Sequence, residues 1–322
     1  MIFMLNLMRG AYIAVKECLG LREGEEFLII TDMNKYRMGK VLALIGAALN
    51  GIVSFVEIPV GERPGSEPPK AVAEAMKAAD VVLIPTTHSM THTQATGNAL
   101  KAGARVVTMP GVTEEMFKGP LTCDYKEVEV LTRKLGDLLT KANKASITSP
   151  SGTNLTIHLE DREGWLDTGI FHKPGDVGNL PAGEAFIAPE EDKGDGTLII
   201  EPVSTMVEDY TKVVLENGRI IEIEETLSGK RLKNFLEAAG ENAFIIAELG
   251  IGTNPKAKIT GNLLEDEKVI DTCHVAFGHN LNFGGKNKAN THIDFVITDP
   301  TLKLEIGEKE VTVLDKGKLL PP

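Results

Sequence analysis

The sequence predicts an α/β N-terminal domain joined to a mostly antiparallel β (α+β) C-terminal domain. Short apolar runs alternate with helical stretches over the first part of the chain, which favours right-handed βαβ units and a flavodoxin-like or Rossmann-like parallel sheet. From Ala145 the pattern changes to alternating, strand-like segments, and Asn217-Gly218 between two of them is a hairpin signal. We therefore expect an α/β domain over 1–144 and a mainly antiparallel β domain over 145–322.

The individual elements follow from apolar runs and the residues that stop them. In the first domain, strands are expected over 26–31, 53–58, 80–85 and 104–109, and helices over 39–50, 70–79, 93–102 and 125–144. In the second domain, strand-like segments are expected within 146–160, 196–202, 210–216 and 219–225, with one helix over 228–240. No G-x-G-x-x-G or P-loop follows any strand of the first domain, so the sequence does not support a nucleotide cofactor.

Composition narrows the classes of function. The 322 residues carry a net charge of -12 with no basic, aromatic-rich patch, which argues against a nucleic-acid partner. No apolar run is long enough to span a bilayer, and the N-terminus lacks the marks of a signal peptide, so no membrane partner is expected. Cys18, Cys123 and Cys273 are odd in number and widely spaced, which favours a reducing, cytoplasmic location over a disulfide framework.

Ionisable residues embedded in apolar, strand-like runs are the main chemical signal. Glu248 lies between apolar residues on both sides, His274 begins another apolar run, and His292 and Asp294 are two apart on a third. Side chains two apart on a strand project from the same face. Burying such groups is costly unless they are paired or bind a metal, and imidazole with carboxylate suits zinc, iron, manganese or cobalt.

Each candidate also has a purely structural interpretation. His292 and Asp294 could form only a hydrogen bond, His274 could be a core histidine, and Glu184 could be an exposed loop residue. For Glu248 a structural pair and a metal ligand are about equally supported. The set as a whole is a stronger signal than its members, because Glu248, His274, His292 and Asp294 lie on consecutive strands and can converge in an antiparallel sheet. Cys273 is a weaker candidate, since it neighbours His274 and should face the opposite side.

Two segments could contribute to substrate binding. The glycine- and asparagine-rich loop 280–290 leads directly to His292 and could form a lid or clamp, with Lys286 or Lys288 holding a substrate carboxylate. Solvated surface lysines are the alternative. The polar segment 86–93 follows the third strand, where ligands of open α/β sheets bind, so His92 could face the site. The alternative is that this segment caps the next helix.

Taken together, these segments resemble the aminopeptidase T family of metallopeptidases. The resemblance spans nearly the whole chain and is carried by the motifs 91–95, 103–105, 109–113, 183–184, 247–252, 273–278 and 292–294. It implies a dimer and a site with two divalent ions, usually zinc or cobalt. The ligands it implies are Glu184, Glu248, His274, His292 and Asp294. The family's tyrosine ligand falls on Leu281, and His279 is the candidate to replace it.

A second resemblance is to 2,5-dihydroxypyridine dioxygenase, through the run 284–294. That enzyme is expected to bind one iron(II) through two histidines and an aspartate, and its first histidine falls on Glu248. Because Glu184 and His274 are retained, the leading hypothesis is an aminopeptidase-type hydrolase. It would act on a small peptide through a metal-activated water, with Glu184 or Glu248 as the candidate general base and zinc, cobalt or manganese as cofactor. The alternatives are an iron(II) ring-cleaving dioxygenase with a small-molecule substrate, and a metal-binding protein without catalysis.

Overall fold

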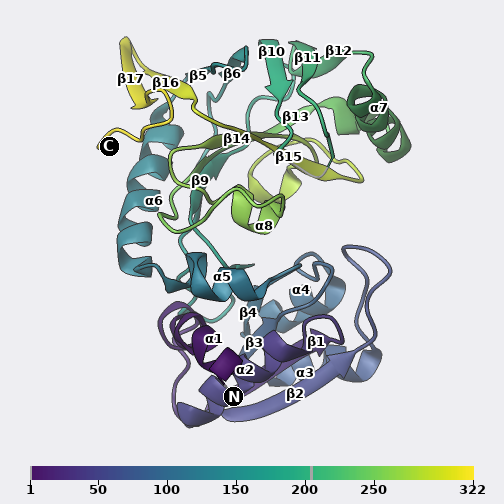
Figure 1. The fold of residues 1–322 in the computed structure, drawn as a ribbon, viewed down its shortest axis with the longest axis vertical. Coiled ribbons are helices and arrows are strands. Elements are labelled where there is room, and N and C mark those ends of the chain that lie inside the picture. The colour runs from purple at the N-terminus through teal and green to yellow at the C-terminus, as the bar shows by residue number, and fades with distance from the viewer. Residues whose placement is uncertain (1, 204–205) are drawn as a thin grey trace. The chain divides into compact units, whose positions relative to one another are not determined.

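The computed structural model describes residues 2–203 and 206–322, which divide into two compact units (Figure 1). Unit 1 comprises residues 1–129, 167–182 and 255–257, and unit 2 comprises residues 130–166, 183–254 and 258–322. The expected break after residue 144 is not where the chain divides. The division falls within the helix α6 (Tyr125–Lys141), whose residues from Val130 on belong to unit 2, and a later segment returns to unit 1.

Unit 1 contains the predicted parallel sheet, in the order β2-β1-β3-β4-β8. Its strands are β1 (Glu26–Asp32), β2 (Ile52–Ile58), β3 (Val81–Ile84), β4 (Arg105–Thr108) and β8 (Val177–Asn179), and all neighbours pair in parallel. Its helices are α1 (Ile2–Tyr12), α2 (Tyr36–Ala48), α3 (Lys70–Ala78), α4 (Gln94–Lys101) and α5 (Glu114–Lys118), with helical turns at Ile13–Cys18 and Pro120–Thr122. The order of strands is the flavodoxin-like one.

The fifth strand of this sheet was not expected from the sequence. β8 has only three residues and comes after α6, yet it completes the sheet by pairing with β4. The other four strands are those that the apolar runs predict, and they form the expected parallel sheet. Residues of α3 and α4, including Met76 and Ala99, pack with Ile30 and Val82 on one face of the sheet.

Unit 2 is built from two sheets. The first has the strand order β12-β11-β10-β6-β5-β16-β17, and its neighbouring strands pair antiparallel. The second has the strand order β15-β14-β13-β9-β7 (Figure 1). The strands of the first are β5 (Lys144–Thr148), β6 (Asn154–His158), β10 (Gly194–Ile200), β11 (Thr211–Glu216), β12 (Arg219–Ile223), β16 (Thr301–Ile306) and β17 (Lys309–Leu314). Those of the second are β7 (Gly164–Asp167), β9 (Glu184–Ile187), β13 (Ile246–Gly252), β14 (Cys273–Gly278) and β15 (His292–Ile297).

The helices of unit 2 are α6, α7 (Leu227–Ala239) and α8 (Leu263–Asp266), with short 3-10 turns at Glu241–Phe244 and Leu281–Phe283. One hydrophobic core joins the two sheets with α6 and α7, through residues such as Leu135, Leu198, Leu236 and Val275. The predicted hairpin is present, and Asn217 and Gly218 both have positive φ, as a tight two-residue turn requires. Among the described residues, no helix has the length and apolar character needed to cross a membrane.

Candidate functional site

The candidate ligands lie on one face of the second sheet of unit 2. The strand register aligns them in cross-strand rows with small or apolar residues. These rows are Glu184 with Gly252; Phe186, Gly250, His274 and Val296; Glu248, Ala276 and Asp294; and Gly278 with His292. Since side chains alternate between faces along a strand, all five predicted ligands project from the same side.

A β-bulge on β13 determines which of its side chains face the core and which face the candidate site. The register shifts between Ile246 and Glu248, so that Ile246 packs in the core while Glu248, two residues later, turns to the site. Leu249 and Ile251 continue the core face. Cys273 also lies on the core face, and burial raises the pKa of its thiol well above the ordinary range. The structure therefore places this cysteine away from the ligand cluster, as strand alternation predicts.

Glycines on β13 make room for the cluster. A Cβ atom at Gly250 would lie 2.0 Å from Nε2 of His274, so the imidazole occupies the space above this glycine. A Cβ atom at Gly252 would lie 2.0 Å from the carbonyl oxygen of Val269, so the chain leading into β14 crosses there. The motif Glu-Leu-Gly-Ile-Gly thus combines a ligand candidate with two positions where only glycine fits.

The ionisable side chains form a continuous chain of short contacts. His274 Nε2 lies 3.2 Å from Glu248 Oε1 and 3.5 Å from Glu184 Oε2. His292 Nε2 lies 3.4 Å from Glu248 Oε2 and 3.2 Å from Asp294 Oδ1. Two groups meet the distance requirement for a metal ion and share Glu248: Glu184, Glu248 and His274 form the inner group, and Glu248, His292 and Asp294 form the outer group.

Charge interactions dominate the titration of these side chains in the absence of metal. Burial lowers the pKa of His292, but Asp294 and Glu248 outweigh it and raise that pKa to about 10. Burial also lowers the pKa of His274, and Glu248 and Glu184 raise it to about 9. For Asp294 burial raises the pKa, and His292 lowers it to about 2. The carboxylates therefore create a strong demand for positive charge, which a cation or protonated histidines can meet.

The donor atoms fit a divalent first-row transition metal. His292 Nδ1 lies 2.7 Å from the carbonyl oxygen of His279, which can only accept a hydrogen bond, so Nδ1 carries the proton and the Nε2 lone pair is left to bind a metal. Glu184 Oε2, in the inner group, is buried with no hydrogen-bond partner, and the His274 imidazole lies beside it with Nε2 at 3.5 Å. One imidazole and two carboxylates in the outer group suit iron, manganese or zinc.

Lys268 is a member of the cluster that the sequence did not indicate. Its Nζ lies 2.6 Å from Glu184 Oε1 and 2.5 Å from Glu267 Oε1, and its side chain is 1% exposed. Burial raises the pKa of Glu184 to about 7 even though Lys268 and His274 oppose the shift. The lysine lies in the connection between α8 and β14, in no apolar periodic run, so only the adjacent acidic residue could have drawn attention to it.

The loop 280–290 is held by hydrogen bonds to side chains. Glu191 accepts hydrogen bonds from Asn280 Nδ2 and from the backbone N–H of Lys286, and pairs with Arg162 at 2.5 Å. Asn287, which is buried, donates to the carbonyl oxygens of Asn242 and Gly278. The side chains of Asn280 and Asn287 thus anchor the loop to the rest of unit 2 through hydrogen bonds.

The remaining predicted substrate and ligand residues are distributed as follows. The side chains of Lys286 and Lys288 are exposed on the loop. His92 is exposed in unit 1, between β3 and α4, where Thr93 caps α4 by accepting from the Thr96 N–H. Within the described chain, His279 belongs to neither group of the cluster, and it contributes its backbone carbonyl oxygen to His292. Leu281 is exposed.

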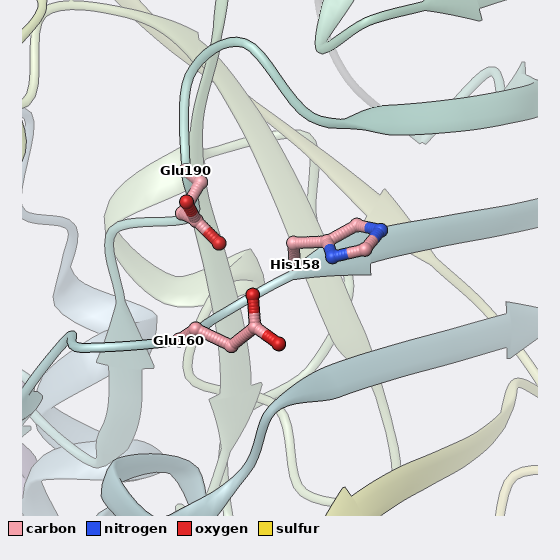
Figure 2. A group of neighbouring side chains, drawn as sticks. All are labelled: His158, Glu160 and Glu190. Carbon is pink, nitrogen blue, oxygen red and sulfur yellow. The ribbon is translucent and has the colours of Figure 1, made fainter.

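A second group of possible ligands lies elsewhere in unit 2. His158, Glu160 and Glu190 come together at the end of β6 and after β9, and Figure 2 shows their side chains gathered around one space. Lys193 Nζ lies 2.9 Å from Glu190 and 3.4 Å from Glu160. The carboxylates in this half-exposed group therefore already have a cationic partner.

Solved structures show the class of fold to which this arrangement belongs. The 2,5-dihydroxypyridine dioxygenase of Pseudomonas putida KT2440 superimposes with a TM-score of 0.80 at 20% identity, covering 98% of this chain and 97% of that one. Wild-type AmpT of Thermus thermophilus superimposes with a TM-score of 0.73 at 16% identity, covering 99% of this chain and all of the other. Both likenesses concern the fold, so the fold alone does not separate a dioxygenase from a peptidase.

Sequence comparison identifies the family. The model of the 2,5-dihydroxypyridine 5,6-dioxygenase family matches residues 22–321. The curated 2,5-dihydroxypyridine 5,6-dioxygenase of Pseudomonas putida KT2440 is 24% identical over 251 residues, which are 73% of this chain and 70% of that protein. The chain belongs to the 2,5-dihydroxypyridine 5,6-dioxygenase family. The leading expectation of an aminopeptidase-type hydrolase or protease is therefore wrong, and the alternative is favoured.

Proposed function

We propose that the protein is a metal-dependent dioxygenase that opens a small dihydroxylated aromatic ring. Family membership supports the reaction class. The structural observation that carries the proposal is the outer group of Glu248, His292 and Asp294, in which His292 has a side chain that is 29% exposed while its neighbours are buried. A metal held there would have protein ligands on one side and an accessible side for substrate and oxygen.

Iron(II) is the ion we propose, and when bound it would supply the oxygen chemistry that side chains cannot perform. Glu248, His292 and Asp294 would hold it. The resemblance to 2,5-dihydroxypyridine dioxygenase implies a histidine at the position of Glu248. A carboxylate there adds negative charge beside the metal, which favours higher oxidation states and makes this site electronically different from one with two imidazoles.

The chain's own groups would orient the metal and the ring. The hydrogen bond from His292 Nδ1 to the His279 carbonyl fixes the imidazole in one tautomer and orientation. The Phe283 ring meets the His292 ring edge to face at 5.8 Å and the Phe186 ring at 5.4 Å. These rings offer an aromatic surface beside the accessible ligand, suited to a planar substrate. Lys286 and Lys288 remain candidates to attract an ionised ring hydroxyl.

Oxygen consumption tests this proposal. Protein loaded anaerobically with iron(II) is mixed with oxygenated buffer and a panel of 2,5-dihydroxypyridine, other dihydroxypyridines and catechols, while dissolved oxygen and ring absorbance are followed. We expect uptake of one O₂ for each ring opened and a product heavier than substrate by two oxygen atoms. Protein that contains bound iron yet consumes no oxygen with any member of the panel would refute the proposal.

A matched pair of variants shows where the reaction occurs. His292→Ala should abolish oxygen uptake, because it removes the only imidazole of the outer group. His158→Ala changes the histidine of the separate group formed with Glu160 and Glu190, and it should leave oxygen uptake at the parent level. Equal activity in both variants would place the reaction somewhere else in the molecule.

A further inference from the structure

We propose that Lys268 occupies the place of a second cation in the cluster and thereby restricts the site to one metal ion, in the outer group. In this assignment Glu184 is not a metal ligand, although it lies beside one of the two possible positions. The inference rests on the proposed function only in that the outer group binds a metal. It concerns how many ions the chain accepts and which residue sets that number.

The backbone brings Lys268 to the cluster by a specific local arrangement. Gly252 lies opposite Glu184 in the register of β13 and β9. Because Gly252 has no side chain, residues 268 and 269 cross directly over it: a Cβ there would be 2.0 Å from the Val269 carbonyl oxygen and 2.8 Å from the Lys268 carbonyl carbon. The Asn254 N–H donates to the Lys268 carbonyl oxygen at 2.9 Å, which fixes the crossing.

The ammonium group is committed to two carboxylates. Its distances of 2.6 Å to Glu184 Oε1 and 2.5 Å to Glu267 Oε1 are those of charge-assisted hydrogen bonds. With the side chain 1% exposed, water screens these contacts very little. A metal in the inner group would be bound by the same carboxylate that already holds the ammonium group. Two cations sharing one buried carboxylate repel each other strongly, because the local dielectric constant is low.

The outer group does not carry this penalty. Its carboxylates, Glu248 and Asp294, have as their close contacts His274 and His292. An imidazolium gives up its proton to make way for a metal more easily than the ammonium group of a lysine does. Lys268 is bonded to Glu184 and Glu267, which are not members of the outer group. The geometry thus separates the cluster into a position where one carboxylate, Glu184, already has a cationic partner and a position suited to a metal.

Counting bound metal tests the assignment without any substrate. Metal-free protein is titrated with cobalt(II), followed by the absorption of the bound ion and by elemental analysis of the desalted protein. We expect one ion per chain in the parent and in Lys268→Arg, which keeps the positive charge. Lys268→Met removes the charge at similar length and should bind a second ion. Two ions in the parent, or one in folded Lys268→Met, would overturn the proposal.

A second variant covers the case in which Lys268→Met does not fold. In Glu184→Gln we expect one ion, bound with an affinity within about tenfold of the parent, a change no larger than that of a neighbour that is not a ligand. Loss of the ion in folded Glu184→Gln would show that Glu184 is a ligand and would overturn the assignment. These counts are independent of oxygen uptake. A protein with one ion and no dioxygenase activity would therefore refute the proposed function and retain the role of Lys268.

Discussion

Two groups in unit 2 contain the same kinds of residue in different surroundings. On β9, β13 and β14, Glu184, Glu248 and His274 are buried together, and the buried Lys268 pairs with Glu184. Beyond β6, His158, Glu160 and Glu190 are half-exposed, and their lysine, Lys193, is 44% exposed. Composition and spacing alone therefore do not distinguish a reactive cluster from an ordinary surface group.

Burial makes the difference. In the surface group of His158, Glu160 and Glu190, the hydrogen bond from Lys193 lowers the pKa of Glu160, which is the usual behaviour of a solvated ion pair. In the buried cluster, desolvation raises the pKa of Glu184 to about 7 in spite of the lysine beside it. Ionised groups that are kept in such an environment are costly, and strongly shifted groups of this kind are typical of functional sites.

The two lysines should differ most in their contribution to stability. Lys268→Met leaves Glu184 and Glu267 buried without their cation, and breaking such a pair costs about 3–5 kcal/mol of unfolding free energy. Lys193→Met removes a solvated ion pair and should leave the denaturation midpoint unchanged. Urea denaturation of metal-free protein at neutral pH measures both. Similar losses in the two variants would contradict the contrast.

Removing a ligand from the outer group should strongly lower the affinity of the protein for its metal ion. His292→Ala or Asp294→Ala deletes one of three donors, so affinity should fall by more than about 100-fold, beyond the range typical of neighbours that do not bind the metal. Unit 1 has its own core, so its fold should survive. Competition with a chromogenic chelator measures the affinity. Unchanged affinity in His292→Ala would mean that His292 and Asp294 form only a structural hydrogen bond.

Filling the space above Gly250 should disturb the buried cluster with little change in chemistry. Gly250→Ala places a methyl group 2.0 Å from the His274 Nε2 position, and such overpacking costs about 1–3 kcal/mol. Gly97→Ala, where an added Cβ meets nothing within 4 Å, is the matched control and should not destabilise the protein. Thermal denaturation of both variants decides the matter, and equal stability would show that the His274 ring can move aside freely.

The pH dependence of stability should reflect the two histidines of the ligand cluster, His274 and His292. The pKa values of His274 and His292 are raised to about 9 and about 10, above the value of about 6.5 expected when unfolded. The folded, metal-free protein therefore holds more protons, so these residues stabilise it fully below about pH 6.5 and lose that effect as pH rises toward 10. Denaturation midpoints between pH 6 and 10 should fall, and a rise would contradict these shifts.

The smallest effect is expected from His158→Ala. His158 has a buried Nδ1 without a hydrogen-bond partner, but the carboxylates near it already bind Lys193. Metal content per chain, measured by elemental analysis after purification, should equal that of the parent. A decrease by a whole ion would show that the surface group binds metal and that burial is a poor guide in this protein.

The sequence by itself determined much about this protein. Strands predicted from apolar runs, such as 26–31 and 53–58, and the Asn217-Gly218 hairpin are all present, because periodicity and turn chemistry are local properties. The convergence of Glu248, His274, His292 and Asp294 also followed from side-chain alternation on consecutive strands, whereas Glu184 was implied only by the resemblance to the aminopeptidase T family. The same residues did not separate hydrolase from dioxygenase, since both interpretations use imidazole and carboxylate ligands on one fold.

Only the tertiary structure decided the rest. The addition of β8 to the sheet of unit 1, the bulge that sends Ile246 and Glu248 to opposite faces, and the arrival of Lys268 beside Glu184 all join segments that lie far apart in the chain or depend on strand register. No local propensity encodes such contacts, because their free energy comes from packing and charge pairing that exist only once the segments meet. The cation that balances Glu184 could therefore not be read from the residues around it.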